Sequence, residues 1–337
     1  LIVIYSSSVG NESRTSAPPT DWEVSVAASE QPATVEAGSH IGRAGWTRGR
    51  GCQPLAEILS DNEVVPVRGD LTTTCITAGI DLIVARKMTR FDLVSTAVPH
   101  DVDFDRVTSV TIAVGEGPHT PLAAAIGARI ATSLGVPGEL TTVFRTDPES
   151  EGALTRLSRL ADSHSGLARR SVANSSATVL LDGLDPCALL VVGAPGGSWI
   201  HRQLFAPGHK LQVAAPGGTI VVRSSPRRCF QEAVDANGIA VSPHLPASVA
   251  STIVFHPAVP VAHQGELVGI LRKDALFAAG PHRLVGQIME PPVSVSATEP
   301  ATAVRELREY LEFGPVPVVG LRGRLIGVVP SGPSSVS

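Results

Sequence analysis

Short apolar segments alternate with helical segments between residues 110 and 193, and this alternation restricts the fold more than any other feature. Each strand-like segment is rich in β-branched or other apolar residues: VTIAV at 110–114, ELTTVFR at 139–145, ATVLL at 177–181 and LLVVG at 189–193. An alanine-rich stretch at 121–134 and EGALTRLSRLADSHS at 151–165 are typical of helices. Strands that alternate with helices in this way predict a parallel sheet with helices on both faces.

A glycine- and proline-rich segment follows the last of these strands. Glycines let backbone N–H groups approach an anion, so the segment predicts a phosphate-binding loop at the carboxyl end of a strand. The candidate phosphate-binding residues are Gly193, Gly196, Gly197, Ser198 and Gly208.

The segment GEGPHT at 115–120 is expected beside that loop, because ligands of parallel sheets bind at the carboxyl ends of the strands. Gly115, Glu116 and Gly117 are therefore further candidates. Two roles stay open for Glu116, a hydrogen bond to a ribose or amine and a solvated acid at a loop tip. His119 is likewise open to contact with a phosphate or a place at the surface.

Composition favours a soluble globular protein of two or three domains, since 43% of the 337 residues are hydrophobic and 17% are charged. The net charge of −4, with both signs interspersed, predicts neither a nucleic acid nor a membrane partner. No apolar run approaches the ~20 residues that cross a bilayer, so we expect a cytoplasmic protein.

Catalytic and metal-binding patterns are not found in the sequence. The four cysteines are scattered without a Cys-x-x-Cys pair, and the ten histidines show no zinc-binding spacing. No recognisable set of nucleophile and base is present either. We therefore predict a protein that is not an enzyme and holds no metal.

Residues 1–105 are interpreted as a worn copy of the α/β pattern. DLIVA at 81–85 aligns with ALLVV at 188–192, but Arg86 stands where the second copy has Gly193. The following segment at 86–99 contains no glycine. Arg43, Arg48 and Arg50 could meet phosphates, but we predict a solvated loop there, and a first copy that serves as a packing partner.

One plan occurs twice after residue 227. Each unit contains a strand, a helix, a Val-Pro-Val strand at 259–261 or 316–318, and a hairpin into GELVGI at 265–270 or GRLIGV at 323–328. Gly265 and Gly323 lie where a tight hairpin needs a positive φ. The pattern predicts an internal repeat of about fifty residues.

The α/β segment resembles a universal stress protein domain. ATP-binding members of that family carry Gly, two residues, Gly, nine residues, then Gly and Ser or Thr. Gly193 and Gly196 match, whereas the third position falls on Ala206, and Gly115 stands where an Asp usually ends the first strand. The resemblance implies an ATP-type ligand at this loop.

The repeat looks like a CBS domain pair, because IMEPPV at 288–293 matches the opening of such a unit. Many CBS pairs hold AMP, ATP or S-adenosylmethionine at an ending of Gly, two apolar residues, Thr or Ser, two residues and Asp. The first unit ends from Gly269 to Asp274 with Arg272 in place of the hydroxyl, and the second ends at Pro330 and Ser331 without the acid. The resemblance implies ligand contacts at Arg272 and Asp274.

The expected fold is α/β, with two Rossmann-like, universal-stress-protein-type parallel-sheet domains at 1–105 and 106–226 and a CBS pair (α+β) at 227–337. This order resembles proteins of actinobacterial type. It implies a non-catalytic regulator that senses an adenine nucleotide (ATP or AMP), forms a homodimer through PVPVV at 315–319 and the helix AVRELREYLEF at 303–313, and acts on an unknown protein partner. The alternatives are a scaffold with decayed nucleotide sites and an enzyme acting on nucleotides.

Overall fold

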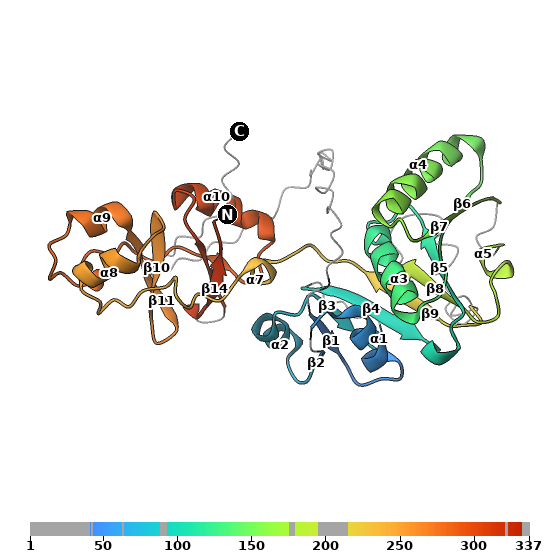
Figure 1. The fold of residues 1–337 in the computed structure, drawn as a ribbon, viewed down its shortest axis with the longest axis horizontal. Coiled ribbons are helices and arrows are strands. Elements are labelled where there is room, and N and C mark those ends of the chain that lie inside the picture. Colours follow the sequence, from blue (N-terminus) through green and yellow to red (C-terminus); the bar gives the residue numbers. More distant parts are fainter. Residues whose placement is uncertain are drawn as a thin grey trace, which may run out of the picture. The chain divides into compact units, whose positions relative to one another are not determined.

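The computed structural model describes residues 41, 43–62, 64–87, 93–174, 179–194, 215–320 and 323–331. All of them belong to one compact unit, Ala37–Ser337. Figure 1 shows a large sheet with its helices, and a second part built of short strands and helices. The strands predicted at 1–5 and 22–28 lie outside the described residues.

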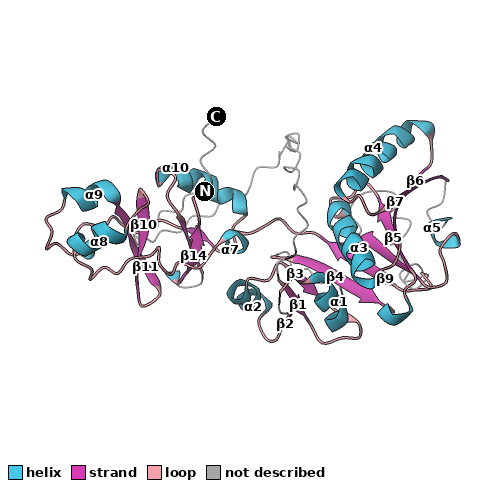
Figure 2. Ribbon diagram, in the orientation of Figure 1, coloured by secondary structure: helices cyan, strands magenta, loops and turns pink. Residues whose placement is uncertain are grey.

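Nine described strands form one sheet in the order β2-β1-β3-β4-β9-β8-β5-β6-β7. Neighbouring strands are parallel except β4 and β9, which pair antiparallel (Figure 2). The strands are β1 (Ala44–Trp46), β2 (Val65–Pro66), β3 (Leu82–Val84), β4 (Ser95–His100), β5 (Ser109–Val114), β6 (Gly138–Phe144), β7 (Ala168–Ala173), β8 (Ala188–Gly193) and β9 (Thr219–Arg223).

This single sheet differs from the two separate sheets that the sequence predicts. The antiparallel ladder between β4 and β9 extends from Thr96 opposite Arg223 to His100 opposite Thr219. Both strands are largely buried, so their pairing removes two apolar sheet edges from solvent. The two halves of the sheet have the same strand order. Strands β6, β5, β8 and β9 of one half correspond to β2, β1, β3 and β4 of the other, which has no counterpart of the edge strand β7.

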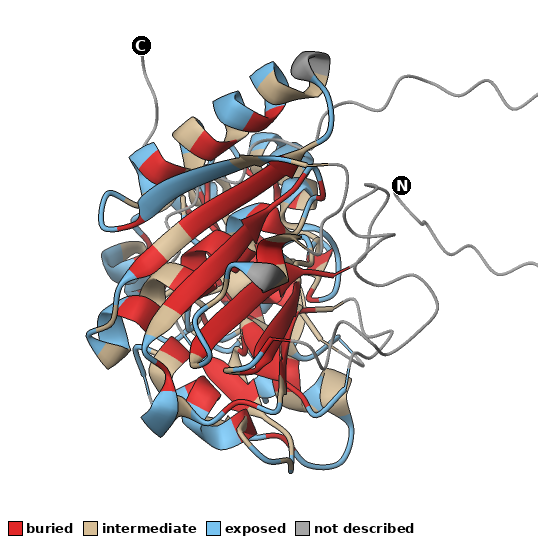
Figure 3. Ribbon diagram, turned by 90° about the vertical axis from the view of Figure 1, so that its right-hand side faces the viewer, coloured by how far each residue is buried: buried red, intermediate tan, exposed pale blue. Residues whose placement is uncertain are grey.

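Helices α1 (Cys52–Leu59), α3 (Thr120–Leu134) and α4 (Asp147–Ser163) pack on one face of the sheet, where they share a core with Ile112 and Leu189. The opposite face of the same strands, at Ala113 and Leu190, packs with the short α5 (Val179–Asp182). The alternation follows from the two-residue period of a strand. Figure 3 shows the strands buried along most of their length.

The predicted helix at 121–134 is confirmed as α3, which ends at Gly135 with φ 66°. The glycine at this position takes the left-handed conformation that stops a helix. Gly127 inside the helix lies against the sheet, since a Cβ there would be 2.4 Å from Cγ1 of Ile112. Two further elements precede β5, the helix α2 (Leu71–Ala78) and the 3₁₀ turn η1 (Phe104–Arg106).

The third strand of the second half was predicted wrongly. Of the segment ATVLL, the described residues from Val179 are helical. The strand is β7, ARRSVA, whose residues are mostly exposed because it lies at the edge of the sheet. A short apolar run does not distinguish a strand from a buried helix, and an exposed edge strand has no apolar alternation to reveal it.

The C-terminal part is the predicted repeat. Its hairpins are confirmed, with Gly265 at φ 81° and Gly323 at φ 74°. Its elements are α7 (Cys229–Glu232), α8 (Ala247–Ile253), β10 (Ala258–His263), β11 (Glu266–Arg272), α9 (Lys273–Ala278), η2 (Val285–Gln287), β12 (Val295–Ser296), η3 (Ala301–Ala303), α10 (Val304–Tyr310), β13 (Val316–Val319) and β14 (Leu325–Val329).

The two units of the repeat exchange the segments that precede them. Glu290, ahead of the second unit, pairs with Ile270 of the first, and Val234, ahead of the first, pairs with Val328 of the second. The hairpins also meet, because Glu266 pairs with Arg324. Each unit is thus completed by backbone from the other.

Candidate functional site

The carboxyl ends of β5 and β8 lie side by side, because these parallel strands are paired up to Ile112 and Val191. The structure therefore brings Gly193, the last residue of β8, to the same edge as the segment 115–117, as predicted. Gly115 and Gly117 are buried, whereas Glu116 is exposed. The other glycine-loop candidates lie outside the described residues: Gly196, Gly197, Ser198 and Gly208.

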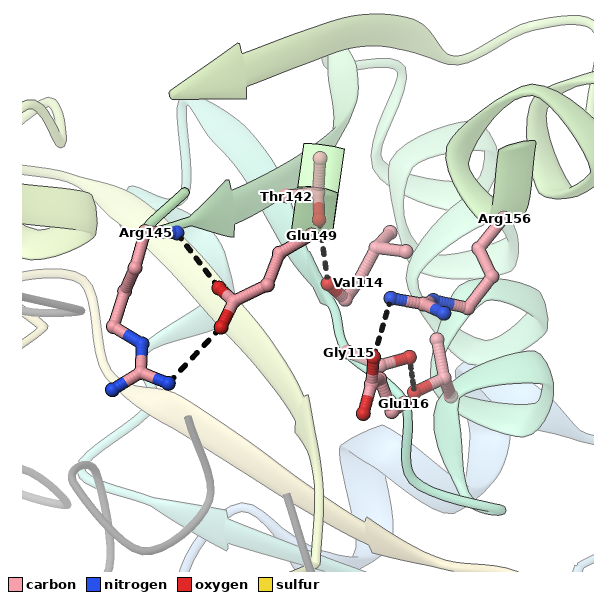
Figure 4. Close-up of polar contacts among 8 residues, drawn as sticks. Val114, Gly115, Glu116, Thr142, Arg145, Glu149 and Arg156 are labelled. Atoms are coloured by element: carbon pink, nitrogen blue, oxygen red, sulfur yellow. Dashed lines mark hydrogen bonds and ion pairs between the residues drawn. The ribbon is translucent and has the colours of Figure 1, made fainter. Parts of the chain in front are cut away.

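Two buried threonines fix the loop that follows β5 (Figure 4). The hydroxyl of Thr120 donates to the carbonyl oxygen of Gly115 at 3.1 Å, and the hydroxyl of Thr142 donates to that of Val114 at 3.1 Å. Because a buried carbonyl without a partner is costly, these bonds hold the loop in one conformation. A ligand at this edge would meet a preformed backbone.

Two ion pairs, each with one partner on α4, lie near the loop. Nη2 of Arg156 lies 3.0 Å from Oε1 of Glu116, so this acid is paired rather than merely solvated (Figure 4). Arg145 donates both its backbone N–H and its guanidinium to Glu149, which lowers the pKa of that carboxyl. Nε of Arg156 is buried and has no hydrogen-bond partner in the described structure.

His119 is fixed at the same edge by Ser224, a residue that sequence reasoning missed. Nδ1 of His119 lies 2.8 Å from the hydroxyl oxygen of Ser224 and accepts the Ser224 backbone N–H at 3.1 Å. The hydroxyl of Ser224 has one proton, which goes either to Nδ1 of His119 or to the carbonyl of Pro118 at 3.2 Å. A serine directly after β9 was the only sequence signal, and these contacts join the end of β9 to the 115–120 loop.

Arg272 lies where the two units of the repeat meet. Its Nε donates to both carboxylate oxygens of Glu290, at 2.9 and 3.0 Å, and its Nη1 donates to Glu312 at 3.0 Å. Nη2 donates to the carbonyl of Tyr310 at 3.2 Å, and the guanidinium lies 5.0 Å from the centre of the Tyr310 ring. The pKa of Arg272 is raised, mainly because Glu290 accepts its hydrogen bonds.

Asp274 lies in the first turn of α9, two residues after Arg272, and is exposed. Its carboxylate accepts the backbone N–H of Ala275 at 2.7 Å. Arg272 and Asp274 are thus neighbours, but the guanidinium is bound to Glu290 and Glu312. In the second unit the position equivalent to Arg272 is Pro330, which brings no charge.

Metal sites, membrane spans and cysteines were searched for in the described part of the chain. Within it, no group of three or more His, Cys, Asp or Glu side chains could hold a metal ion. No described helix combines the length and apolarity needed to span a membrane. The cysteines are free thiols, and burial raises the pKa of Cys75 to about 12 and that of Cys229 to about 11.

A scan against models of protein families found no match, and a search of curated proteins found none either. Among solved structures, the cytosolic domain of the Mg²⁺ channel MgtE in complex with ATP is similar at 27% identity and a TM-score of 0.24. That match covers 27% of this chain and 41% of the MgtE chain, so less than half of that protein is represented.

The CBS-pair protein CBSX2 from Arabidopsis thaliana is similar at 20% identity and a TM-score of 0.28, over 32% of this chain and 91% of its own. The CBS domain pair of protein MJ0100, in complex with 5′-methylthioadenosine and S-adenosyl-L-methionine, is similar at 20% identity and a TM-score of 0.27. That match covers 32% of this chain and 90% of the MJ0100 chain. With the exchanged segments described above, the chain is an α/β protein with a large, mostly parallel sheet and a CBS-pair-like region.

Proposed function

We propose that this chain is a non-catalytic regulatory protein that senses an adenine nucleotide of the ATP or AMP type. The observation that carries this function is the CBS-pair-like exchange of segments, with Arg272 at the junction of the two units. A guanidinium in that position binds carboxylates in the structure and is equally suited to a phosphate.

Ligand binding would act through Glu312. This carboxylate is 68% exposed and shares Arg272 with Glu290. An incoming phosphate competes with Glu312 for Nη1, because both are anionic acceptors. Glu312 and Phe313 have positive φ angles of 53° and 64°, which are uncommon for residues with a side chain. Release of Glu312 would remove one contact between the first unit and this turn, so that occupancy changes how the units are joined.

The sheet edge at Gly193 offers a second nucleotide position. The strand order β7-β6-β5-β8-β9 is 3-2-1-4-5 when the strands are numbered in chain order, and Nη2 of Arg156 lies beside the loop at 115–117, where it pairs with Glu116. We assign the two sheet halves, on this basis, to the universal-stress-protein type. The glycine loop from Gly196 onward would hold the phosphates.

Calorimetric titration with ATP, AMP and S-adenosylmethionine tests both positions. Asp274 is exposed, and Asp274→Asn removes one negative charge. Glu306→Gln is the matched control, because Glu306 is an exposed acid of α10. Loss of binding in Asp274→Asn but not in Glu306→Gln places the sensor in the repeat. Loss only in Gly196→Val places it in the sheet. Absence of heat with every ligand would contradict the proposed function.

The alternative is a scaffold that forms homodimers through the repeat. Of the predicted dimer surface, the segment PVPVV is buried in the chain's own core, whereas Tyr310 (52%) and Phe313 (63%) of the predicted helix at 303–313 are exposed. Further exposed apolar side chains lie on and beside α8 and α9, among them Phe255 (79%) and Phe277 (66%). Light scattering of Phe255→Asp and Phe277→Asp tests this alternative, which expects a dimer that these changes convert to a monomer.

A further inference from the structure

A cavity of about 320 Å³ opens at the carboxyl ends of β1 and β2, in the half of the sheet expected to carry no site. It is lined by Trp46, Arg48, Pro66, Val67 and Arg68. Its volume lies in the range of roughly 300–1,000 Å³ that is typical of small-molecule sites. The carboxyl edge is also where parallel sheets bind their ligands.

The register of β1 and β2 builds this cavity. Trp46 ends β1 directly opposite Pro66, and the backbone N–H of Val67 donates to the Trp46 carbonyl at 2.8 Å. The indole is half-buried against the main core, which fixes one of its sides. Trp46 therefore presents a positioned aromatic surface, and Pro66 and Val67 supply the apolar wall beside it.

Basic residues follow three neighbouring strands at this edge. Arg48 comes two residues after β1, Arg68 two residues after β2, and Arg86 two residues after β3. The parallel pairing of these strands brings all three to the same side. Helix α1 also begins here, after Gly51, and its N-terminus adds partial positive charge.

Three acidic residues of this half are bound to other groups or lie at the opposite edge, whereas Asp101 and Asp103 follow β4, two strands away from β1. Asp61 is bound to Arg129, Asp70 accepts bonds from Thr73, and Asp81 precedes β3 at the opposite end of the strand. In the described structure, the side chains of Arg48 and Arg68 make no hydrogen bond or ion pair. Two exposed guanidiniums thus flank an aromatic wall without a carboxylate partner.

We propose that this cavity binds a nucleoside phosphate, with the base against the Trp46 indole and phosphate oxygens on Arg48 and Arg68. An aromatic side chain stacks on any base, and arginine forks bind phosphate through two parallel hydrogen bonds. This site shares no residue with the other two candidate positions. It uses the side chains of Trp46, Arg48 and Arg68, whereas the position at Gly193 uses a glycine-rich backbone and the repeat uses Arg272.

Fluorescence of Trp46 reports on this cavity alone. The chain has three tryptophans, so the full-length variant Trp22→Phe/Trp199→Phe keeps only Trp46. We expect ATP to quench its emission to saturation, and inorganic tripolyphosphate and adenosine to bind about tenfold more weakly, since each lacks one half of the contacts. Arg68→Gln in this background should raise the Kd for ATP about tenfold.

Arg159→Gln is the matched control, because Arg159 is an exposed arginine on α4 whose removal changes the net charge equally. It should leave the Kd unchanged, and circular dichroism checks that each variant is folded. No saturable quenching by ATP, or an Arg68→Gln variant that binds like Arg159→Gln, would overturn the assignment. Tripolyphosphate binding as tight as ATP would overturn the nucleoside part. A negative result would leave the proposed sensor function untouched, since Trp46 reports only on a ligand beside it.

Discussion

Ile270 and Glu290 exchange two backbone hydrogen bonds, from the Ile270 N–H at 3.0 Å and from the Glu290 N–H at 2.8 Å. Val234 and Val328 form the equivalent pair in the other unit, at 2.8 and 2.9 Å. Gly269, which precedes Ile270, and Gly327, which precedes Val328, allow this close approach of the two backbones. A Cβ at Gly269 would be 2.7 Å from the Glu290 carbonyl oxygen, and one at Gly327 would be 2.3 Å from that of Val234.

Gly327→Ala should therefore destabilise the repeat. The added methyl group meets backbone rather than a flexible side chain, so the exchanged segment must move, at a cost of roughly 1–3 kcal/mol. Urea denaturation followed by circular dichroism measures the free energy of unfolding. Gly280→Ala is the control, because nothing lies within 4 Å of its Cβ position, and it should leave stability unchanged or slightly higher. Equal losses in the two variants would contradict the close approach.

Replacement of Arg272 should cost more stability than replacement of its exposed partner. Arg272→Ala leaves Glu290 without two charged hydrogen bonds, and we expect a loss of about 1.5–3 kcal/mol. Glu312→Gln should cost less than about 1 kcal/mol, since that carboxylate is 68% exposed. Denaturant titration of both variants gives the comparison, and the reverse order would show that Glu312 holds the junction.

The contact between α3 and β5 can be tested by a double-mutant cycle. Gly127→Ala places a methyl group on Cγ1 and Cδ1 of Ile112 and should cost roughly 1–3 kcal/mol. Ile112→Ala removes both atoms, so the double variant should lose less stability than the sum of the single losses. Thermal or urea unfolding of the four proteins measures the coupling, and strictly additive losses would argue against this contact.

His164 should make the protein less stable in mild acid. Its Nε2 is buried without a hydrogen-bond partner in the described structure, and burial lowers its pKa below 6.5. The unfolded state takes up the proton first as the pH falls. The contribution of neutral His164 to the free energy of unfolding is therefore fully present above about pH 6.5 and is lost as the pH falls through the folded pKa. His164→Leu should remove this contribution to the difference in stability between pH 8 and pH 5.5. His282→Leu, an exposed histidine, should retain it.

Local patterns predicted much of the fold. Strand β5 and helix α3 follow from apolar periodicity with a glycine stop, and the hairpin glycines from the repeated Gly-x-Leu. Strand β4 was missed because STAVPH has a polar start and a proline. Its partner β9 lies more than a hundred residues away, and no local signal gives such a pairing.

The candidate sites divide in the same way. Gly193 and the 115–117 segment were predicted to meet, because both end parallel strands. Ser224 and Arg156 were missed, since they reach that edge from elements whose positions depend on the whole sheet. The convergence of Trp46 and Arg68 depends on the register of two very short strands, which the sequence does not reveal.

The antiparallel step between β4 and β9 also decides where ligands can be placed. Strands β1 to β4 point one way and β5 to β9 the other, so the carboxyl ends of the two halves emerge at opposite rims of one sheet. A nucleotide beside Trp46 and a nucleotide beside Gly193 could not touch. Binding at one rim could affect the other through the β4–β9 ladder or through Arg129 of α3, which contacts Asp61 and the Ile58 carbonyl of the first half.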